Sequence, residues 1–438
     1  MVFRYVIIAD DLTGANDTGV QFTRYEYKSY VIIDPTNITE KIDRLRGLAN
    51  VVVINTESRA DPPEKAYKKC REVAEALRRE VVEVVYKKVD STMRGNIGVE
   101  LDGVLDGLGR ELALFTPAFP LNGRIVMGGY LLVHGSPLDL TPFADDPVSP
   151  VKEANVLSII KKQSRRTIGH VSYDYVSGGV ESIRKRVEEL RGEANIIVFD
   201  AATQENLQDI SLAIKDYYGE AIYSGSAGLA RELPKAWGEK ESMSEKKLSI
   251  EGSYVVCLCG SVNPATLEQV RHLKEHVDSE IIDIDASLIL KNPEKVFQEI
   301  VKRARESISQ GRRCIVVRSA KSREDVEKTQ KVGQNMGLSR EMVAGKIASF
   351  LGELGKAIAT DVGKELAGMV ITGGDIAINT CRKLLIDALE IVDEIDPGVP
   401  LTKATMKSRE LYIVTKAGGF GKENTITKAV KLLLGEET

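Results

Sequence analysis

The sequence is poor in the residues that build metal centres and disulfide frameworks. Its 438 residues include 4 histidines and 5 cysteines, and no two cysteines have the Cys-x-x-Cys spacing of structural zinc sites. The odd number of scattered cysteines also argues against a disulfide framework. We therefore expect buried free thiols in a reducing compartment, with two of them on one face of the strand in "YVVCLCGS". The cysteines are Cys70, Cys257, Cys259, Cys314 and Cys381.

Long apolar runs and an excess of charge of one sign are missing as well. No uncharged stretch reaches the ~18 residues that a membrane helix needs. The start, "MVFRYVIIADD", has no charged region, long apolar core and cleavage site of the kind found in signal peptides. The net charge of -4 gives no basic field for nucleic acid or lipid. We expect a cytoplasmic protein that binds neither nucleic acids nor membranes.

What the sequence does contain is a regular alternation of short apolar runs and longer amphipathic segments. Hydrophobic residues make up 43% and charged residues 28%, as in ordinary globular proteins. Strand–helix alternation with continuous apolar strands predicts mostly parallel sheets that are covered on both faces. The predicted strands are 5–9, 51–55, 84–89, 112–117, 195–200, 220–225, 253–261, 279–285, 313–319, 368–374 and 411–419. A helix is predicted over 62–80.

A charged segment divides this pattern into two parts. The stretch "GEKESMSEKKLSIEG" has few large apolar residues and is bounded by glycines, which is typical of a linker. We predict an α/β fold with two non-identical three-layer domains, residues 1–238 and 253–438, joined by a linker over 239–252, with an interdomain cleft. The stretch 117–175 is rich in Gly, Pro and His and weakly periodic, so a long functional loop is expected there.

Two adjacent acids follow the first predicted strand, in "ADDLTGANDTG". Ligands of open α/β sheets bind beyond the carboxyl ends of the strands, which places Asp10 and Asp11 at a candidate site. One acid at such a turn can simply cap the following helix. Two adjacent acids repel and need donors or a cation, which favours a functional role. Asp17 is a third acid, and it either contributes or only caps the helix.

Other strand ends in the first half add cations and hydroxyls. Arginine forks suit carboxylates and phosphates, and helix N-termini favour anions. A lone histidine in such a segment is more often structural than catalytic. This mixture suits a small polyhydroxylated anion. The candidates are Ser58 and Arg59 in "TESRAD"; Asp90, Ser91 and Arg94 in "DSTMRGNIG", preceded by Lys87 and Lys88; and Arg124 and His134 in "TPAFPLNGRIVMGGYLLVHGSPL".

The second half carries three glycine-rich turns after predicted strands. They are "CGSVNPAT" with Ser261, "TGGDIA" with Gly373, Gly374 and Asp375, and "KAGGFGKENT" with Gly418 and Gly421. Successive backbone N–H groups in such turns can cradle phosphate oxygens. None matches GxxxxGK[ST], nor GxGxxG with an acid ~20 residues later, which argues against an ordinary P-loop kinase and against an NAD dehydrogenase. An anion-and-polyol site in one domain and a phosphate site in the other indicate a kinase.

These motifs, together with "KKVDSTMRGNIG" and "SGSAGLA", resemble those of the four-carbon acid sugar kinase family, in the family's order and over nearly the whole chain. The resemblance implies a sugar-binding N-terminal domain, a nucleotide-binding C-terminal domain, and ATP-dependent phosphorylation of threonate, erythronate or 3-oxo-tetronate in a catabolic pathway. It implies an acid sugar site drawing on Asp10, Asp11, Ser58, Arg59, Asp90, Ser91, Arg94 and Arg124. It implies a nucleotide site drawing on Ser261, Gly373, Gly374, Asp375, Gly418 and Gly421.

Within this resemblance, ATP and Mg²⁺ are the expected cofactors. Asp11 is the favoured general base, and Asp375 is the competing candidate for base or metal contact. One position departs from the family pattern, because Ile376 stands where a threonine usually follows the acid. The alternatives are a kinase of another small hydroxy acid and a non-catalytic sugar-acid sensor. The identity of the sugar and the phosphorylated hydroxyl stay open, and the charged surface permits a monomer or a homodimer.

Overall fold

The computed structural model describes residues 3–146, 149–242, 248–406 and 409–437. The chain divides into two compact units, Met1–Ser244 and Glu245–Thr438. Residues 243–247 of the expected linker lie outside the described residues. Among the helices that are described, none combines the length and the apolar character needed to cross a bilayer.

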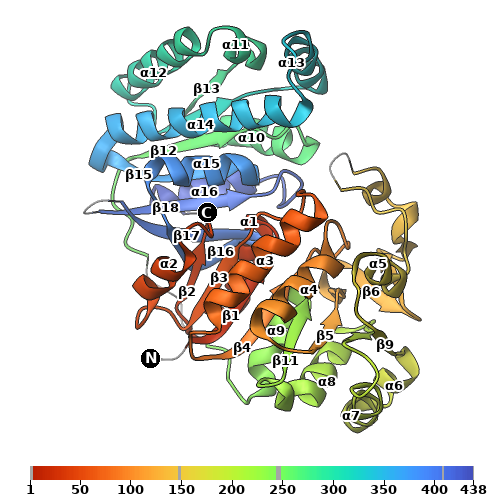
Figure 1. The fold of residues 1–438 in the computed structure, drawn as a ribbon. Coiled ribbons are helices and arrows are strands. Elements are labelled where there is room, and N and C mark those ends of the chain that lie inside the picture. Colours follow the sequence, from red (N-terminus) through yellow and green to blue (C-terminus); the bar gives the residue numbers. More distant parts are fainter. Residues whose placement is uncertain (1–2, 147–148, 243–247, 407–408, 438) are drawn as a thin grey trace. The chain divides into compact units, whose positions relative to one another are not determined.

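The first unit is built on eight parallel strands in the order β2–β3–β1–β4–β11–β5–β10–β9 (Figure 1). The predicted parallel α/β architecture is confirmed here. The strands are β1 Phe3–Ala9, β2 Ser29–Ile32, β3 Val51–Asn55, β4 Val82–Lys88, β5 Leu112–Thr116, β9 Ile168–Val171, β10 Ile196–Phe199 and β11 Ala221–Gly225. The prediction missed β2 and β9, which are short strands of 4 residues each.

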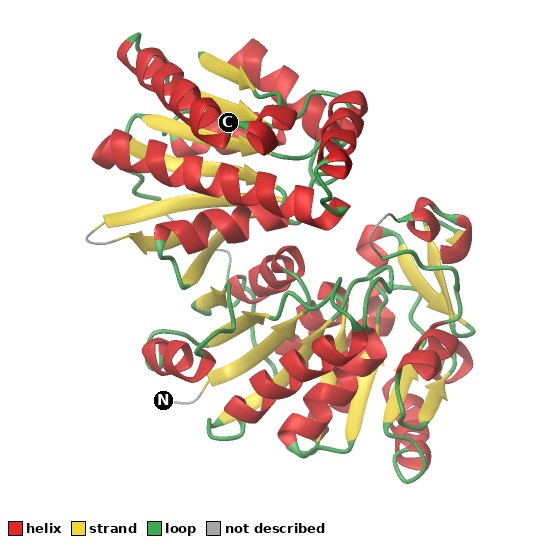
Figure 2. Ribbon diagram, turned by 45° about the horizontal axis from the view of Figure 1, so that its top comes forward, coloured by secondary structure: helices red, strands yellow, loops and turns green. Residues whose placement is uncertain are grey.

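The central strands are buried on both faces because helices flank them (Figure 2). Every residue of β3, "VVVIN", is buried, and so is every residue of β10, "IIVF". The helix expected over 62–80 is α3, whose apolar stripe is buried as the spacing predicts. The helices of this unit are α1 Leu12–Thr23, α2 Ile38–Leu45, α3 Pro63–Leu77, α4 Ile97–Leu108, α5 Val156–Gln163, α6 Tyr173–Ser177, α7 Gly179–Leu190, α8 Gln204–Ile214 and α9 Ala227–Ala236.

The strand register brings the carboxyl ends of the central strands to one edge. Ala9 pairs with Asn55 of β3 and with Lys88 of β4, and Lys88 pairs in turn with Gly225 of β11. Thr116 of β5 also lies level with Gly225. The segments that follow these strands therefore emerge side by side, and they carry the acids and arginines predicted from the sequence.

The prediction of one long loop over 117–175 is wrong. A three-stranded antiparallel sheet occupies part of it, with β6 Arg124–Met127, β7 Tyr130–Val133 and β8 Ser136–Pro137, and α5 and β9 follow. The strands are short and turn through glycines with positive φ, so they lack the length at which alternation becomes visible. The buried carboxylate of Asp200 holds the turn by accepting from the N–H groups of Gly128 and Gly129, at 2.7 and 2.9 Å.

The second unit has a mixed sheet in the order β13–β14–β12–β15–β18–β17–β16. The first five strands pair in parallel, whereas β17 is antiparallel to both neighbours. The strands are β12 Tyr254–Cys259, β13 Ser279–Asp283, β14 Cys314–Arg318, β15 Leu366–Thr372, β16 Ala388–Asp396, β17 Val399–Met406 and β18 Arg409–Lys416. The helices are α10 Pro264–His276, α11 Ala286–Lys291, α12 Pro293–Ser309, α13 Arg323–Asn335, α14 Arg340–Val362, α15 Gly374–Leu384 and α16 Thr425–Leu433.

Here too the parallel strands end in register. Cys259 pairs with Arg318 and with Thr372, and Thr372 pairs with Lys416. The turns that begin at Gly260, after Arg318, at Gly373 and after Lys416 therefore share one edge. All five cysteines are buried free thiols, as predicted.

Candidate active site

The first acid pair lies where β1 meets α1. Asp11 is the N-cap of α1, and its Oδ1 accepts from the backbone N–H of Gly14 at 2.7 Å. A Cβ on Gly14 would lie 2.6 Å from Asp11 Oδ1 and 2.9 Å from Lys88 Nζ, so only glycine leaves room for both groups. Asp17 lies inside α1 and does not cap it. Capping therefore accounts for only one of the two carboxylate oxygens of Asp11.

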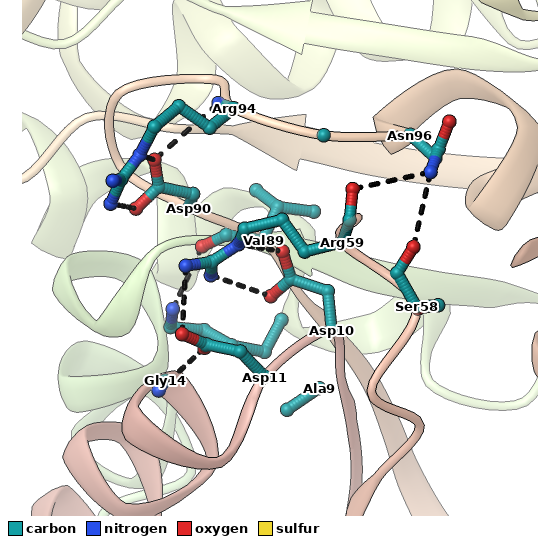
Figure 3. A network of polar contacts seen from close by, with 12 residues as sticks. Ala9, Asp10, Asp11, Gly14, Ser58, Arg59, Val89, Asp90, Arg94 and Asn96 are labelled. Atoms are coloured by element: carbon teal, nitrogen blue, oxygen red, sulfur yellow. Dashed lines mark hydrogen bonds and ion pairs between the residues drawn. The ribbon is translucent and has the colours of Figure 1, made fainter. Parts of the chain in front are cut away.

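Arg59 joins the two adjacent acids (Figure 3). Its Nε and Nη2 donate to the two oxygens of Asp10 at 2.7 and 3.1 Å, and its Nη1 donates to Asp11 Oδ2 at 2.7 Å. The Asp10 side chain is 2% exposed and that of Asp11 is 28% exposed. Burial would raise the pKa of Asp10, but the charges of Arg59 and Lys87 outweigh it and lower that pKa. The two carboxylates can therefore coexist because one guanidinium bridges them and the charge of Lys87 acts in the same sense on Asp10.

A second carboxylate–arginine pair follows β4. Arg94 Nε and Nη2 donate to the two oxygens of Asp90 at 2.7 and 3.2 Å, and Arg94 Nη1 donates to Asp146 at 3.1 Å. Burial opposes ionisation of Asp90, yet Arg59 and Arg94 hold its pKa well below the usual range. Ser91 lies half-buried in the turn beside this pair. The guanidinium of Arg94 is thus occupied by acids of the protein itself.

Ser58 lies deeper than the sequence suggested. Its hydroxyl is fully buried and donates to Glu100 at 2.6 Å, and Glu100 forms an ion pair with Lys87 at 2.8 Å. Asn96 was not among the predicted residues, yet its Nδ2 donates to the carbonyl groups of Ser58, Arg59 and Asp61 at 3.0, 3.3 and 2.8 Å. It fixes the loop that carries Arg59 (Figure 3). The sequence did offer a signal for Asn96, because it directly precedes a helix. Asparagine at that position is usually interpreted as a helix N-cap, so a role in holding a loop is easily overlooked.

Two cations at this edge have no carboxylate partner among the described residues. Lys88 is 4% exposed, and its Nζ donates only to the carbonyl of Val89, at 2.8 Å. Arg124, on β6, donates to the carbonyl of Asn122, and its buried Nε has no partner in the described part of the chain. Burial lowers the pKa of Arg124, while Asp90 and Asp17 act on it in the opposite sense. Such cations suit an incoming anion. His134 is exposed and packs its ring against Gly123.

The second unit contains a pocket of about 260 Å³ at its strand ends. Five of the six predicted nucleotide-site residues line it, namely Ser261, Gly373, Gly374, Asp375 and Gly418. Gly421 does not line the pocket. Gly373 has a φ of 105°, which an L side chain rarely adopts, so glycine is required where β15 turns into α15. The prediction that these turns converge is consistent with this geometry.

The other half of the pocket has mostly apolar walls, which the sequence reasoning missed. Residues of α11, α13 and α14 supply it, together with the two residues that follow β14. They are Ala286, Ser319, Ala320, Val326, Thr329, Gln330, Ala344, Ile347 and Ala348. Ser319 and Ala320 could have been found by the strand-end rule, but the helix residues look like ordinary amphipathic positions. A slot of this kind suits a flat base beside a phosphate-binding edge.

Ile376 belongs to this wall. It is 6% exposed, and its Cδ1 would lie 2.0 Å from a Cβ on Gly260, so the bare backbone at Gly260 is what lets Ile376 pack there. The hydroxyl expected at this position is thus replaced by an apolar contact, while Gly373 and Gly374 remain at the pocket.

Asp375 is the acid of this pocket. It is exposed in the first turn of α15. No cluster of three or more metal-ligating side chains occurs in the residues that the structure describes. Mg²⁺ in phosphoryl-transfer sites is commonly held by one or two carboxylates together with substrate phosphates. A single carboxylate at the mouth of the pocket fits that requirement.

Comparisons with known proteins agree with one candidate site in each of the two units. Residues 5–233 match the family described as the sugar-binding N-terminal domain, and residues 256–426 match the nucleotide-binding C-terminal domain. The chain is 32% identical over 433 residues to a D-threonate kinase of Salmonella typhimurium and 30% identical over 435 residues to a D-erythronate kinase of Heliobacterium modesticaldum. In both cases the match covers 98% of this chain and 97% of the relative.

A third relative, a 3-oxo-tetronate kinase of Pseudomonas savastanoi pv. phaseolicola, is 29% identical over 98% of this chain and 97% of its own. Among solved structures, a Salmonella typhimurium protein described as a putative tRNA synthase has a TM-score of 0.81 at 23% identity, covering 98% of this chain and 99% of that chain. At that identity the likeness supports the fold alone. The two family domains and the full-length relatives show that this chain belongs to the four-carbon acid sugar kinase family.

Proposed function

We propose that this kinase transfers the γ-phosphoryl group of ATP to a hydroxyl of a four-carbon acid sugar of the threonate, erythronate or 3-oxo-tetronate class. The observation that carries the proposal is that Lys88 and Arg124, at the edge that holds the Asp10–Asp11 pair, form no ion pair among the described residues. A small molecule with one carboxylate and several hydroxyls complements both features. The family relationship supplies the reaction class.

In this proposal Arg124 and Lys88 bind the sugar carboxylate. Asp10 and Asp11 accept hydrogen bonds from its hydroxyls. Arg59 positions the acid pair, since its guanidinium already serves both carboxylates. Arg94 orients Asp90 in the same manner, which revises the expectation that Arg94 grips the substrate directly. Ser58 acts from inside the protein, through the Glu100–Lys87 pair.

Asp11 is the proposed general base. Its side chain is 28% exposed, whereas Asp10 is 2% exposed and has both oxygens bonded to Arg59. A base must reach the proton that it removes, so the more exposed carboxylate is the better candidate. Asp11 would take the proton of the attacking hydroxyl on the second lone pair of Oδ2, which also accepts from Arg59, while its Oδ1 keeps the α1 cap in place.

The nucleotide is proposed to occupy the pocket of the second unit. The apolar walls would hold the base, and the backbone at Gly373, Gly374 and Gly418 would hold the phosphates. Asp375 would hold Mg²⁺, which neutralises charge on the phosphate oxygens when bound. The residues of the chain itself bind, orient and shield the phosphates.

An ATP-consumption screen tests the function. Threonates, erythronates and 3-oxo-tetronates are offered with ATP and Mg²⁺, and turnover with at least one of them is expected. Thermal unfolding is measured in parallel, because each true substrate should raise the melting temperature by mass action. Stabilisation by an acid sugar without any ATP turnover would instead identify a sensor. No response to any four-carbon acid would overturn the proposed substrate class.

A further inference from the structure

The last glycine-rich turn, residues 417–421, surrounds a buried lysine. Lys416 ends β18 and is 3% exposed. Its Nζ donates to the carbonyl groups of Ala417, Gly418 and Phe420, each at 3.0 Å, and lies 3.3 Å from the hydroxyl oxygen of Thr266. No carboxylate forms an ion pair with it among the described residues. Its charge is met by neutral oxygens alone.

Helix α10 supplies further hydrogen-bond donors to the buried side of this turn. The Thr266 hydroxyl donates to the carbonyl of Gly418 at 2.8 Å. Three residues further along the same helix face, Gln269 Nε2 donates to the carbonyls of Phe420 and Lys422 at 3.0 and 2.8 Å. Each of these bonds draws a carbonyl of the turn toward the body of the unit.

The opposite side of the turn follows from peptide geometry. In a trans peptide unit the C=O and the N–H of the next residue point in opposite directions. Inward carbonyls at Ala417, Gly418 and Phe420 therefore turn the N–H groups of Gly418, Gly419 and Gly421 away from Lys416. In residues 409–437, which the structure describes, those N–H groups have no acceptor. Free N–H groups gathered in one turn form an anion-binding nest.

We propose that Lys416 is a positioning residue for the nucleotide phosphates, an internal cation that orients the 417–421 turn so that its N–H groups face the ligand. This inference rests on the proposed function, since it assigns the ligand as a nucleoside triphosphate. Lys416 itself touches no substrate. Its backbone carbonyl accepts from Gly373 N–H at 2.9 Å, so the same residue also ties this turn to the Gly373–Gly374 turn.

The state of Lys416 depends on its surroundings. Burial lowers the pKa of its ammonium to about 8. The other titratable group acting on it is Cys259 of β12, and burial raises the pKa of that thiol to about 11, so Cys259 is neutral over the range in which Lys416 titrates. A neutral amine has one proton fewer and cannot serve all of these oxygens.

Nucleotide affinity of the whole protein tests the inference. Lys416→Met keeps the aliphatic stem and removes the charge, and we expect the dissociation constant for ATP–Mg to rise roughly 10- to 100-fold, as for the loss of one or two charged hydrogen bonds. Stabilisation by the acid sugar should not change, because its site lies in the first unit. Lys403→Met is the matched control. Lys403 lies in the same sheet and pairs with Glu410 at 2.8 Å, so ATP affinity should stay at the wild-type value.

Chemical rescue separates orientation of the turn from general damage. In Lys416→Ala, added ethylammonium should restore ATP affinity, and tetramethylammonium at equal ionic strength, which has no N–H donor, should not. If the lysine variants do not fold, the wild-type protein decides, because its ATP affinity should weaken as pH rises through about 8. Unchanged ATP affinity in Lys416→Met, or equal loss of ATP and acid sugar binding, overturns the inference. A wild-type protein that binds no ATP overturns the proposed function instead.

Discussion

Arg124→Ala should separate substrate binding from folding more cleanly than any other change at the acid sugar site. We expect the KM for the acid sugar to rise by two to three orders of magnitude, on the order of 100- to 1000-fold, with the KM for ATP nearly unchanged. The melting temperature should fall by little. This combination is unusual for a partly buried arginine, and it follows from the partners that Arg124 has and lacks.

The magnitude comes from those partners. In the described residues Arg124 has no ion pair; it donates to one carbonyl, that of Asn122, and its buried Nε is unsatisfied. Removing it costs one hydrogen bond, about 1 kcal/mol, and relieves the desolvation of an unpaired charge. A substrate carboxylate would receive two charge-assisted hydrogen bonds from the guanidinium, each worth about 1.5–3 kcal/mol. The lower part of the summed range, a loss of ~3–4 kcal/mol of binding, gives the stated change in KM.

Steady-state kinetics and thermal unfolding of Arg124→Ala measure both quantities. Arg110→Ala is the matched control, because burial also lowers the pKa of Arg110 and it too bonds to one carbonyl, that of Ala221 at 2.7 Å. Arg110 lies near the start of β5, at the edge opposite to the site, so its loss should leave the KM for the acid sugar unchanged. An Arg124→Ala protein with wild-type KM, or a KM change matched by Arg110→Ala, would refute the assignment.

Other changes test the remaining parts. Asp11→Asn should lower kcat at least 100-fold with little change in ATP binding, as expected for loss of a general base; full turnover would remove Asp11 from that role. Asn96→Ala should raise the KM for the acid sugar several-fold and lower the melting temperature, measured together, because it frees the loop 56–61. Ala344→Trp should fill the pocket and weaken ATP binding without affecting the sugar. Between pH 8 and 10, kcat/KM for ATP should fall as Lys416 loses its proton, whereas the Lys416 contribution to the free energy of unfolding should rise, because the unfolded chain binds that proton more tightly.

The strand ends were predictable from sequence because a parallel sheet has only one carboxyl edge. Apolar runs located β1, β3 and β4, and the polar residues after them had to meet. Asp10, Arg59 and Asp90 are therefore found together, as expected. The sequence could not tell which arginines are already neutralised. That depends on side-chain pairing across loops, and Arg94 pairs with Asp146, 52 residues away in the chain.

Neighbouring positions on a strand show the same limit. Lys87 and Lys88 are the same residue type at adjacent positions of one strand, but successive side chains of a strand point to opposite faces of the sheet. Lys87 is fully buried against Glu100, whereas Lys88 donates to the carbonyl of Val89 and forms no ion pair among the described residues. The face could be assigned only once the partner strands and α4 were in place. The apolar pocket walls escaped prediction for a related reason, since a helix that lines a pocket has the same periodicity as one that lines a core.

Both candidate sites contain buried cations that form no ion pair with an acid of the described residues, and one physical rule applies to both. At the sugar site, Asp10, Asp11 and Asp90 form their ion pairs with Arg59 and Arg94, and Lys88 and Arg124 form no ion pair among the described residues. At the nucleotide site, Lys416 donates to carbonyl groups and forms no ion pair with an acid in the part of the chain that the structure describes. An uncompensated buried cation is costly in a folded protein, and it is retained where an anion completes it. Substrate binding should therefore stabilise each unit more than its contact area suggests.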